Sequence, residues 1–175
     1  MNPSFRRFVS LANVIYLLSL VQLVWLVWYF YTGRGGPSEL ACYLVPVALV
    51  LQILFHYREQ KLYPALPAWA NHALVALYVA ICIYAFAYFV VHYEQIAIYR
   101  QGSYTRHDFI VGLGMFLLVM ELSRLLHPTL FWVNVVLVAY TMYGYLSPVD
   151  FFWHPGTSFH RVVTSSTVEL ATGIY

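Results

Sequence analysis

The stretch FVSLANVIYLLSLVQLVWLVWYFY, residues 8–31, contains no charged side chain. It is long enough to cross the hydrocarbon core of a bilayer as one tilted helix. The aromatic residues that end it, from Trp25 to Tyr31, suit the headgroup level of a membrane. Arg6 and Arg7 precede the run, but no small-residue cleavage site follows, so we expect a retained membrane-spanning helix rather than a signal peptide.

Four more apolar segments of similar character follow. Only 9% of the chain is charged and 62% is hydrophobic, whereas about 25% of a soluble domain is charged, so lipid must cover part of this surface. The sequence therefore predicts an all-α, polytopic transmembrane bundle of about five spans with an interfacial C-terminal helix. The predicted later spans are residues 40–57, 73–91, 108–126 and 128–146.

The polar stretch at residues 92–107 divides the predicted bundle into two regions. Residues 1–107 would form a three-span region that ends in a partly interfacial connector. Residues 108–175 would form a two-span hairpin with an amphipathic tail, which carries Phe159, Val162, Val163 and Leu170 on one side. The double arginine before the first span places the N-terminus in the cytoplasm, although lysine and arginine are otherwise almost evenly shared between the two sides.

Glu121 and Arg124 are the first candidates for a functional role, because charges inside a span are expensive and are functional by default. Their spacing of three places them on one helix face, where they can neutralise each other. We expect a structural ion pair near the cytoplasmic face, and a substrate or proton site is the alternative.

Three further polar residues are candidates on the hairpin and the tail. Asn134, inside the fifth predicted span, should hydrogen-bond to a neighbouring helix. Arg161 and Glu169 belong to the tail helix, where contact with solvent or headgroups is the default. Gly112 and Gly114 suggest that another helix packs closely against the fourth span.

The remaining reactive residue types do not form a recognisable catalytic or metal-binding motif. Cys42 and Cys82 lie inside apolar segments and are expected to be small buried residues rather than a disulfide. The seven histidines lie near predicted helix ends, so haem ligation stays open only as an alternative. We expect no cofactor, no metal and no enzymatic activity, and the net charge of +2 gives no reason to expect nucleic-acid binding.

The order of features after residue 107 resembles the fused membrane subunit of TAXI-type TRAP transporters. An aspartate opens the helix DFIVG at residues 108–112, which ends in the acid-then-arginine segment MELSR at 120–124. An apolar helix with AY at 139–140 and YG at 143–144 follows, and then the step GTSFHR at 156–161. The segment TVELATGIY at 167–175 is similar to the family's Thr-x-Glu-Gly-Ile-Phe-Gly pattern, although Thr172 loosens its register.

This resemblance implies a non-catalytic scaffold, the small membrane part of a TRAP-type secondary transporter for organic acids in a bacterial inner membrane. Its expected partners are the large permease subunit, into which the family's chain continues, a periplasmic solute-binding protein and the bilayer. Two alternatives remain open. The chain could be an accessory helical subunit of a respiratory or photosynthetic complex, or a haem- or quinone-binding membrane anchor.

Overall fold

The computed structural model describes residues 10–33, 36–59 and 62–169, and these residues form helices and connecting loops without a strand. Five of the helical segments are long and apolar enough to cross a membrane. The all-α fold with about five spans is therefore confirmed, and the chain is a membrane protein. It divides into two compact units, Met1–Val90 and Val91–Tyr175, which are described separately.

The first unit contains three long helices: α2 (Leu11–Thr32), α3 (Pro37–Glu59) and most of α4 (Ala68–Glu94). A row of aromatic rings connects them, because Trp25 lies 4.9 Å from Tyr43, and Tyr43 lies 5.9 Å from Phe86 between ring centroids. The helix α3 continues through Pro46. Cys42 and Cys82 are buried, as the sequence predicted, and they are not joined in a disulfide.

The third span is longer than predicted, and this corrects the sequence-based boundaries. The helix α4 begins five residues before Ala73, directly after Pro67, and it continues through His92 to Glu94. A π-helix, η1 (Gln95–Tyr99), then extends the span to Tyr99. The stretch 68–99 contains no glycine or proline that would stop a helix, so its polar end stays helical instead of forming a separate interfacial helix.

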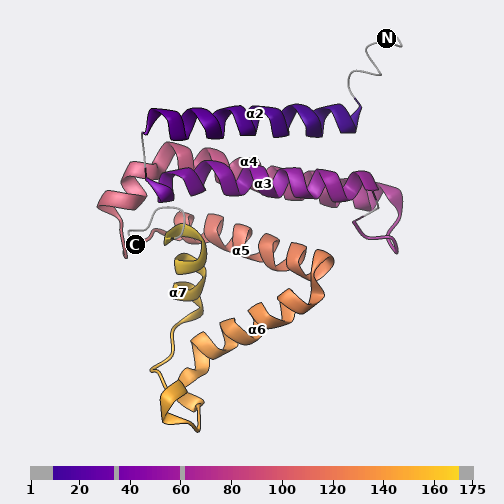
Figure 1. Cartoon of the computed structure of the whole chain (residues 1–175). Helices are drawn as coiled ribbons and strands as arrows, with labels where there is room; N and C mark the ends of the chain where they lie inside the picture. The colour runs from indigo at the N-terminus through magenta and orange to yellow at the C-terminus, as the bar shows by residue number, and fades with distance from the viewer. Residues whose placement is uncertain (1–9, 34–35, 60–61, 170–175) are drawn as a thin grey trace. The chain divides into compact units, whose positions relative to one another are not determined.

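The second unit begins with the last residues of α4, from Val91, and with η1, and it contains two further long helices and a short C-terminal return (Figure 1). Thr105 caps the N-terminus of α5. The helix α6 starts with a proline, which is favourable there because proline has no backbone N–H and the N–H groups in the first turn of a helix have no partner within the helix. Its elements are α5 (Arg106–Leu126), α6 (Pro128–Tyr143), η2 (Gly144–Leu146), η3 (Asp150–Phe152), α7 (Phe159–Val163) and η4 (Thr164–Glu169).

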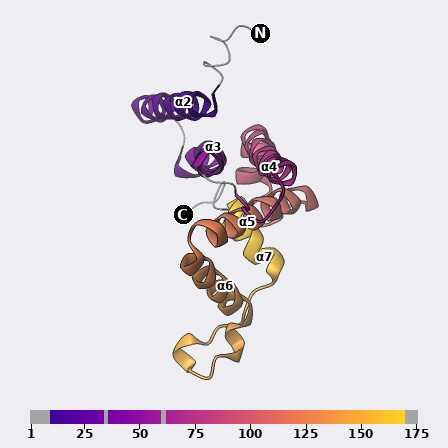
Figure 2. The same cartoon turned by 90° about the vertical axis from the view of Figure 1, so that its right-hand side faces the viewer.

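Within this unit, α6 turns back from the end of α5, and α7 returns to lie against α5 in both views (Figures 1 and 2). Gly112 makes the close approach of α5 and η4 possible. A Cβ atom at this position would lie 2.6 Å from Thr167 Oγ1 and 2.9 Å from Val168 Cγ2. The close packing that the glycines predicted is therefore confirmed for Gly112, and η4 supplies the partner.

The C-terminal tail packs into the second unit through α7 and η4. Val162, Val163, Thr164 and Val168 are buried, whereas Phe159 is 40% exposed. Thr164 can be buried because its hydroxyl donates to the carbonyl of Arg161 at 3.2 Å. Of the residues that the sequence placed on the apolar side of the tail, Val162 and Val163 are buried and Phe159 is partly covered, while Leu170 lies outside the described residues.

The loop between α6 and α7 is fixed by His154. The backbone N–H of Gly156 donates to His154 Nδ1 at 3.1 Å, so Nε2 carries the proton and donates to the carbonyl of Tyr140 at 3.0 Å. The hydroxyl of Tyr140 donates in turn to the carbonyl of Phe152 at 2.7 Å. These bonds determine where the chain begins its return towards α5.

Candidate functional site

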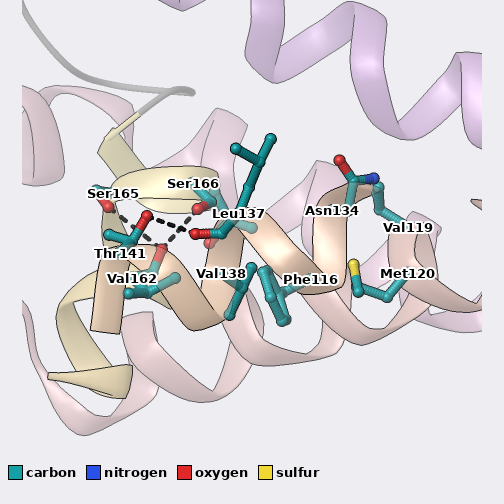
Figure 3. Close-up of a pocket in the computed structure, with 11 residues that line it drawn as sticks. Phe116, Val119, Met120, Asn134, Leu137, Val138, Thr141, Val162, Ser165 and Ser166 are labelled. Atoms are coloured by element: carbon teal, nitrogen blue, oxygen red, sulfur yellow. Dashed lines mark hydrogen bonds between the residues drawn. The ribbon is translucent and has the colours of Figure 1, made fainter. Parts of the chain in front are cut away.

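A cavity of about 420 Å³ lies between α5, α6 and the α7–η4 segment (Figure 3). Phe116 is near the middle of the fourth span and Leu137 is near the middle of the fifth. If both helices cross the bilayer, the cavity therefore lies close to its midplane. Its walls are formed by Phe116, Val119, Met120, Asn134, Leu137, Val138, Thr141, Val162, Ser165, Ser166 and Thr167.

Four of these lining residues carry hydroxyl groups, and each hydroxyl hydrogen is already donated to a backbone carbonyl. Thr141 donates to Leu137 O at 2.8 Å, and Ser165 donates to Arg161 O at 2.7 Å. Ser166 and Thr167 donate to the carbonyls four residues before them at 2.6 and 2.7 Å. Because a carbonyl oxygen only accepts, these hydroxyls keep their lone pairs, but not their protons, for anything else.

Asn134 lies at the opposite end of the cavity from Ser165 and Ser166, beside Met120 (Figure 3). It is partly buried, and within the described part of the chain its amide forms no hydrogen bond. The interhelical bond expected for it is therefore not formed among these residues. The described residues do not enclose this amide, but it lies within an apolar span, where an amide exposed to hydrocarbon is costly, so this side chain favours a partner from outside the described residues.

Glu121 and Arg124 form the expected ion pair, in which two of the three guanidinium nitrogens donate to the carboxylate. Arg124 Nε donates to Glu121 Oε2 at 2.8 Å and Nη2 donates to Oε1 at 2.6 Å. The Glu121 side chain is 26% exposed and the Arg124 side chain is 48% exposed, and neither lines the cavity. This two-point geometry is the strongest form of such a pair, and it satisfies both charges within one helix.

A second ion pair, which the sequence analysis did not identify, stands at the start of α5. Asp108 has no exposed surface, and its Oδ2 accepts from Arg100 Nη1 at 3.1 Å. The same oxygen accepts from the backbone N–H and the hydroxyl of Thr105, each at 2.7 Å. Thr105 Oγ1 accepts from the Asp108 N–H in return, which completes a capping box. The spacing Thr-x-x-Asp before an apolar run could have revealed this cap.

Gln22 was also missed, although it lies midway along the uncharged run that defines α2. Its Nε2 approaches the carbonyl of Leu44 on α3 at 3.5 Å, and its Oε1 has no hydrogen-bond partner among residues 10–33, 36–59 and 62–169. A single amide inside a span is the signal that could have found it. This contact joins α2 to α3.

The other candidates lie away from the cavity. Arg161 is exposed, and its backbone N–H is capped by Ser158 Oγ at 3.3 Å. Glu169 is partly exposed at the end of η4. The described residues contain no group of three or more histidine, cysteine, aspartate or glutamate side chains placed to hold a metal ion. Asn134 and the tail hydroxyls thus line opposite ends of the same cavity, whereas Arg161 and Glu169 do not line it.

Comparisons with protein-family models, with curated proteins and with solved structures return no match to this chain.

Proposed function

We propose that this chain is a non-catalytic scaffold subunit of a membrane complex, namely the small membrane part of a TRAP-type secondary transporter for organic acids. In this proposal it resides in a bacterial inner membrane with its N-terminus in the cytoplasm. The resemblance of residues 108–175 to TAXI-type subunits supports the choice of complex. The chemistry of the second unit supports the scaffold role.

The observation that carries the proposal is the way in which the second unit uses its charges. Arg100 is paired with a buried carboxylate that caps α5, and Arg124 is held at two points by Glu121. A site that carries an organic anion needs cationic or backbone N–H groups free to receive it, usually at a break in a helix near the midplane. The described residues that line the mid-depth cavity include no charged side chain. The two ion pairs, Arg100–Asp108 and Arg124–Glu121, therefore suit a structural role rather than the binding of a transported anion.

The surface of α6 supports assembly with a larger partner. The helix has no buried residue within its 16 residues, and Trp132 and Val136 are 65% and 63% exposed. Lipid alone would cover the apolar side chains, but it would not satisfy the amide of Asn134. A partner helix with a polar side chain satisfies both requirements. The large permease subunit is the partner that the resemblance implies, and a periplasmic solute-binding protein would dock on the assembled complex.

Uptake by reconstituted vesicles tests the proposal. Proteoliposomes that contain the purified chain alone should not accumulate a labelled organic acid under a sodium or proton gradient. Vesicles that contain the chain with its large partner should accumulate it. Gradient-driven uptake by the chain alone would contradict the scaffold role. A haem absorption band at one equivalent in the purified chain would favour the membrane-anchor alternative instead.

A further inference from the structure

We propose that the cavity between α5, α6 and η4 binds a small, uncharged amphiphile that carries a hydroxyl group. The hydroxyl would lie at the end formed by Thr141, Ser165 and Ser166, and the apolar body would extend along Leu137 and Phe116. This inference does not depend on the proposed scaffold function, because it rests on the shape and hydrogen-bonding chemistry of the cavity itself.

The size of the cavity favours a small molecule over a single side chain of a partner helix. Its volume of about 420 Å³ lies within the range of ~300–1,000 Å³ that is typical of small-molecule sites. Apolar side chains form its middle, while polar groups gather at its two ends (Figure 3). A mostly apolar wall with a few fixed polar groups is the usual composition of such sites.

The hydroxyl end of the cavity selects a ligand that donates a hydrogen bond. Thr141, Ser165 and Ser166 have already donated their hydroxyl protons to backbone carbonyls at 2.8, 2.7 and 2.6 Å. They therefore offer acceptor lone pairs only, unless one of those bonds is broken. An alcohol or a phenol supplies the missing proton, whereas an ether, an ester or a quinone carbonyl brings another acceptor.

The cavity also selects against charged ligands. The described lining residues include neither a cationic nor an anionic side chain, and the cavity lies at mid-depth between two apolar spans. An ion would lose its hydration there without a countercharge. The ligand is therefore neutral, which separates this site from the organic acids of the proposed transport complex.

A photoreactive alcohol tests the proposal directly. The full chain in lipid nanodiscs is labelled with octanol that carries a diazirine, and the modified residues are mapped by mass spectrometry. We expect adducts on the cavity walls, in particular on Phe116, Leu137, Val138 and Val162. We also expect 1-octanol to compete for labelling about tenfold more effectively than its methyl ether, the difference expected for one hydrogen bond.

Two pairs of variants separate the cavity from general partition into lipid. Val138→Phe fills the middle of the cavity and should abolish its labelling, whereas Val136→Phe adds the same volume on an exposed face of the same helix and should leave labelling unchanged. Ser166→Ala removes an acceptor and should reduce the preference for octanol over its ether. Its control, Thr129→Val, changes a hydroxyl outside this cavity and should not.

Competition also distinguishes two sources of the hydroxyl group. Displacement of the label by a short-chain hydroquinone assigns the site to a phenolic ligand, and displacement by a monoacylglycerol assigns it to a lipid hydroxyl. Either result agrees with the proposal. Equal competition by octanol and its methyl ether, or equal loss of labelling in Val138→Phe and Val136→Phe at matched folded fractions, overturns it.

Discussion

The ion pair at the start of α5 gives the sharpest prediction about stability. Arg100→Met removes the guanidinium that pairs with the carboxylate of Asp108, which has no exposed surface. Breaking a buried pair in this way costs about 3–5 kcal/mol of unfolding free energy. The two bonds from Thr105, each 2.7 Å long, still stabilise the carboxylate, so we expect the lower end, about 3 kcal/mol.

A change at the other partner of the pair, Asp108→Asn, should cost less unfolding free energy than Arg100→Met, because of the bonds that remain. Asp108→Asn keeps an oxygen that can accept from the N–H and hydroxyl of Thr105, so most of the cap survives. The released Arg100 side chain is 22% exposed and retains a bond from Nη2 to Gln95 Oε1 at 3.0 Å. We expect Asp108→Asn to cost about 1–2 kcal/mol.

Reversible unfolding of the chain in mixed micelles, followed by circular dichroism as dodecyl sulfate is added, measures both values. Arg106→Met is the matched control, because it makes the same substitution at an exposed position of α5 and should change stability by less than about 0.5 kcal/mol. A loss in Arg100→Met no larger than in Arg106→Met would refute the reasoning. So would a greater cost for Asp108→Asn than for Arg100→Met.

Three further predictions concern the second unit. Glu121→Gln or Arg124→Gln alone should destabilise the chain by about 2–3 kcal/mol in the same assay. The double variant should cost less than either single variant, because only the single changes keep one charge in the span while removing its ion-pair partner. Gly112→Ala should lower the unfolding free energy by about 1–2 kcal/mol, although alanine has the better helix propensity. The added Cβ would lie 2.6 and 2.9 Å from side-chain atoms of η4, so amide hydrogen exchange in η4 should become faster. Ser103→Cys should react with a membrane-impermeant maleimide added from the periplasmic side and His127→Cys should not; the opposite pattern would reverse the proposed orientation.

The helical architecture could be predicted because each span is a local property of the sequence. The run at residues 8–31 is apolar throughout, and α6 begins at the proline where the sequence placed it. The ion pair of Glu121 and Arg124 also followed from local spacing on one helix. Each of these features depends on residues only a few positions apart.

Features that depend on distant residues could not be predicted in the same way. The cavity exists because η4 returns to α5 at Gly112, and no local pattern specifies that this segment, rather than another helix, occupies the glycine face. The burial of Thr164 likewise depends on how this segment packs within the second unit, which no pattern in its own sequence specifies. The end of the third span was misjudged for another reason. Polar residues suggested a separate, partly interfacial connector, but the helical segment continues to Tyr99, and no glycine or proline interrupts it before that residue.

Purification from native membranes under mild detergent, followed by native mass spectrometry, tests the scaffold role most directly. We expect the tagged chain to be recovered at a fixed stoichiometry with a larger, multi-span permease. We also expect the exposed face of α6 to be protected from chemical labelling in that complex and accessible in the separated chain. Recovery of the chain by itself or only with copies of itself, with α6 equally accessible in both preparations, would contradict the central claim.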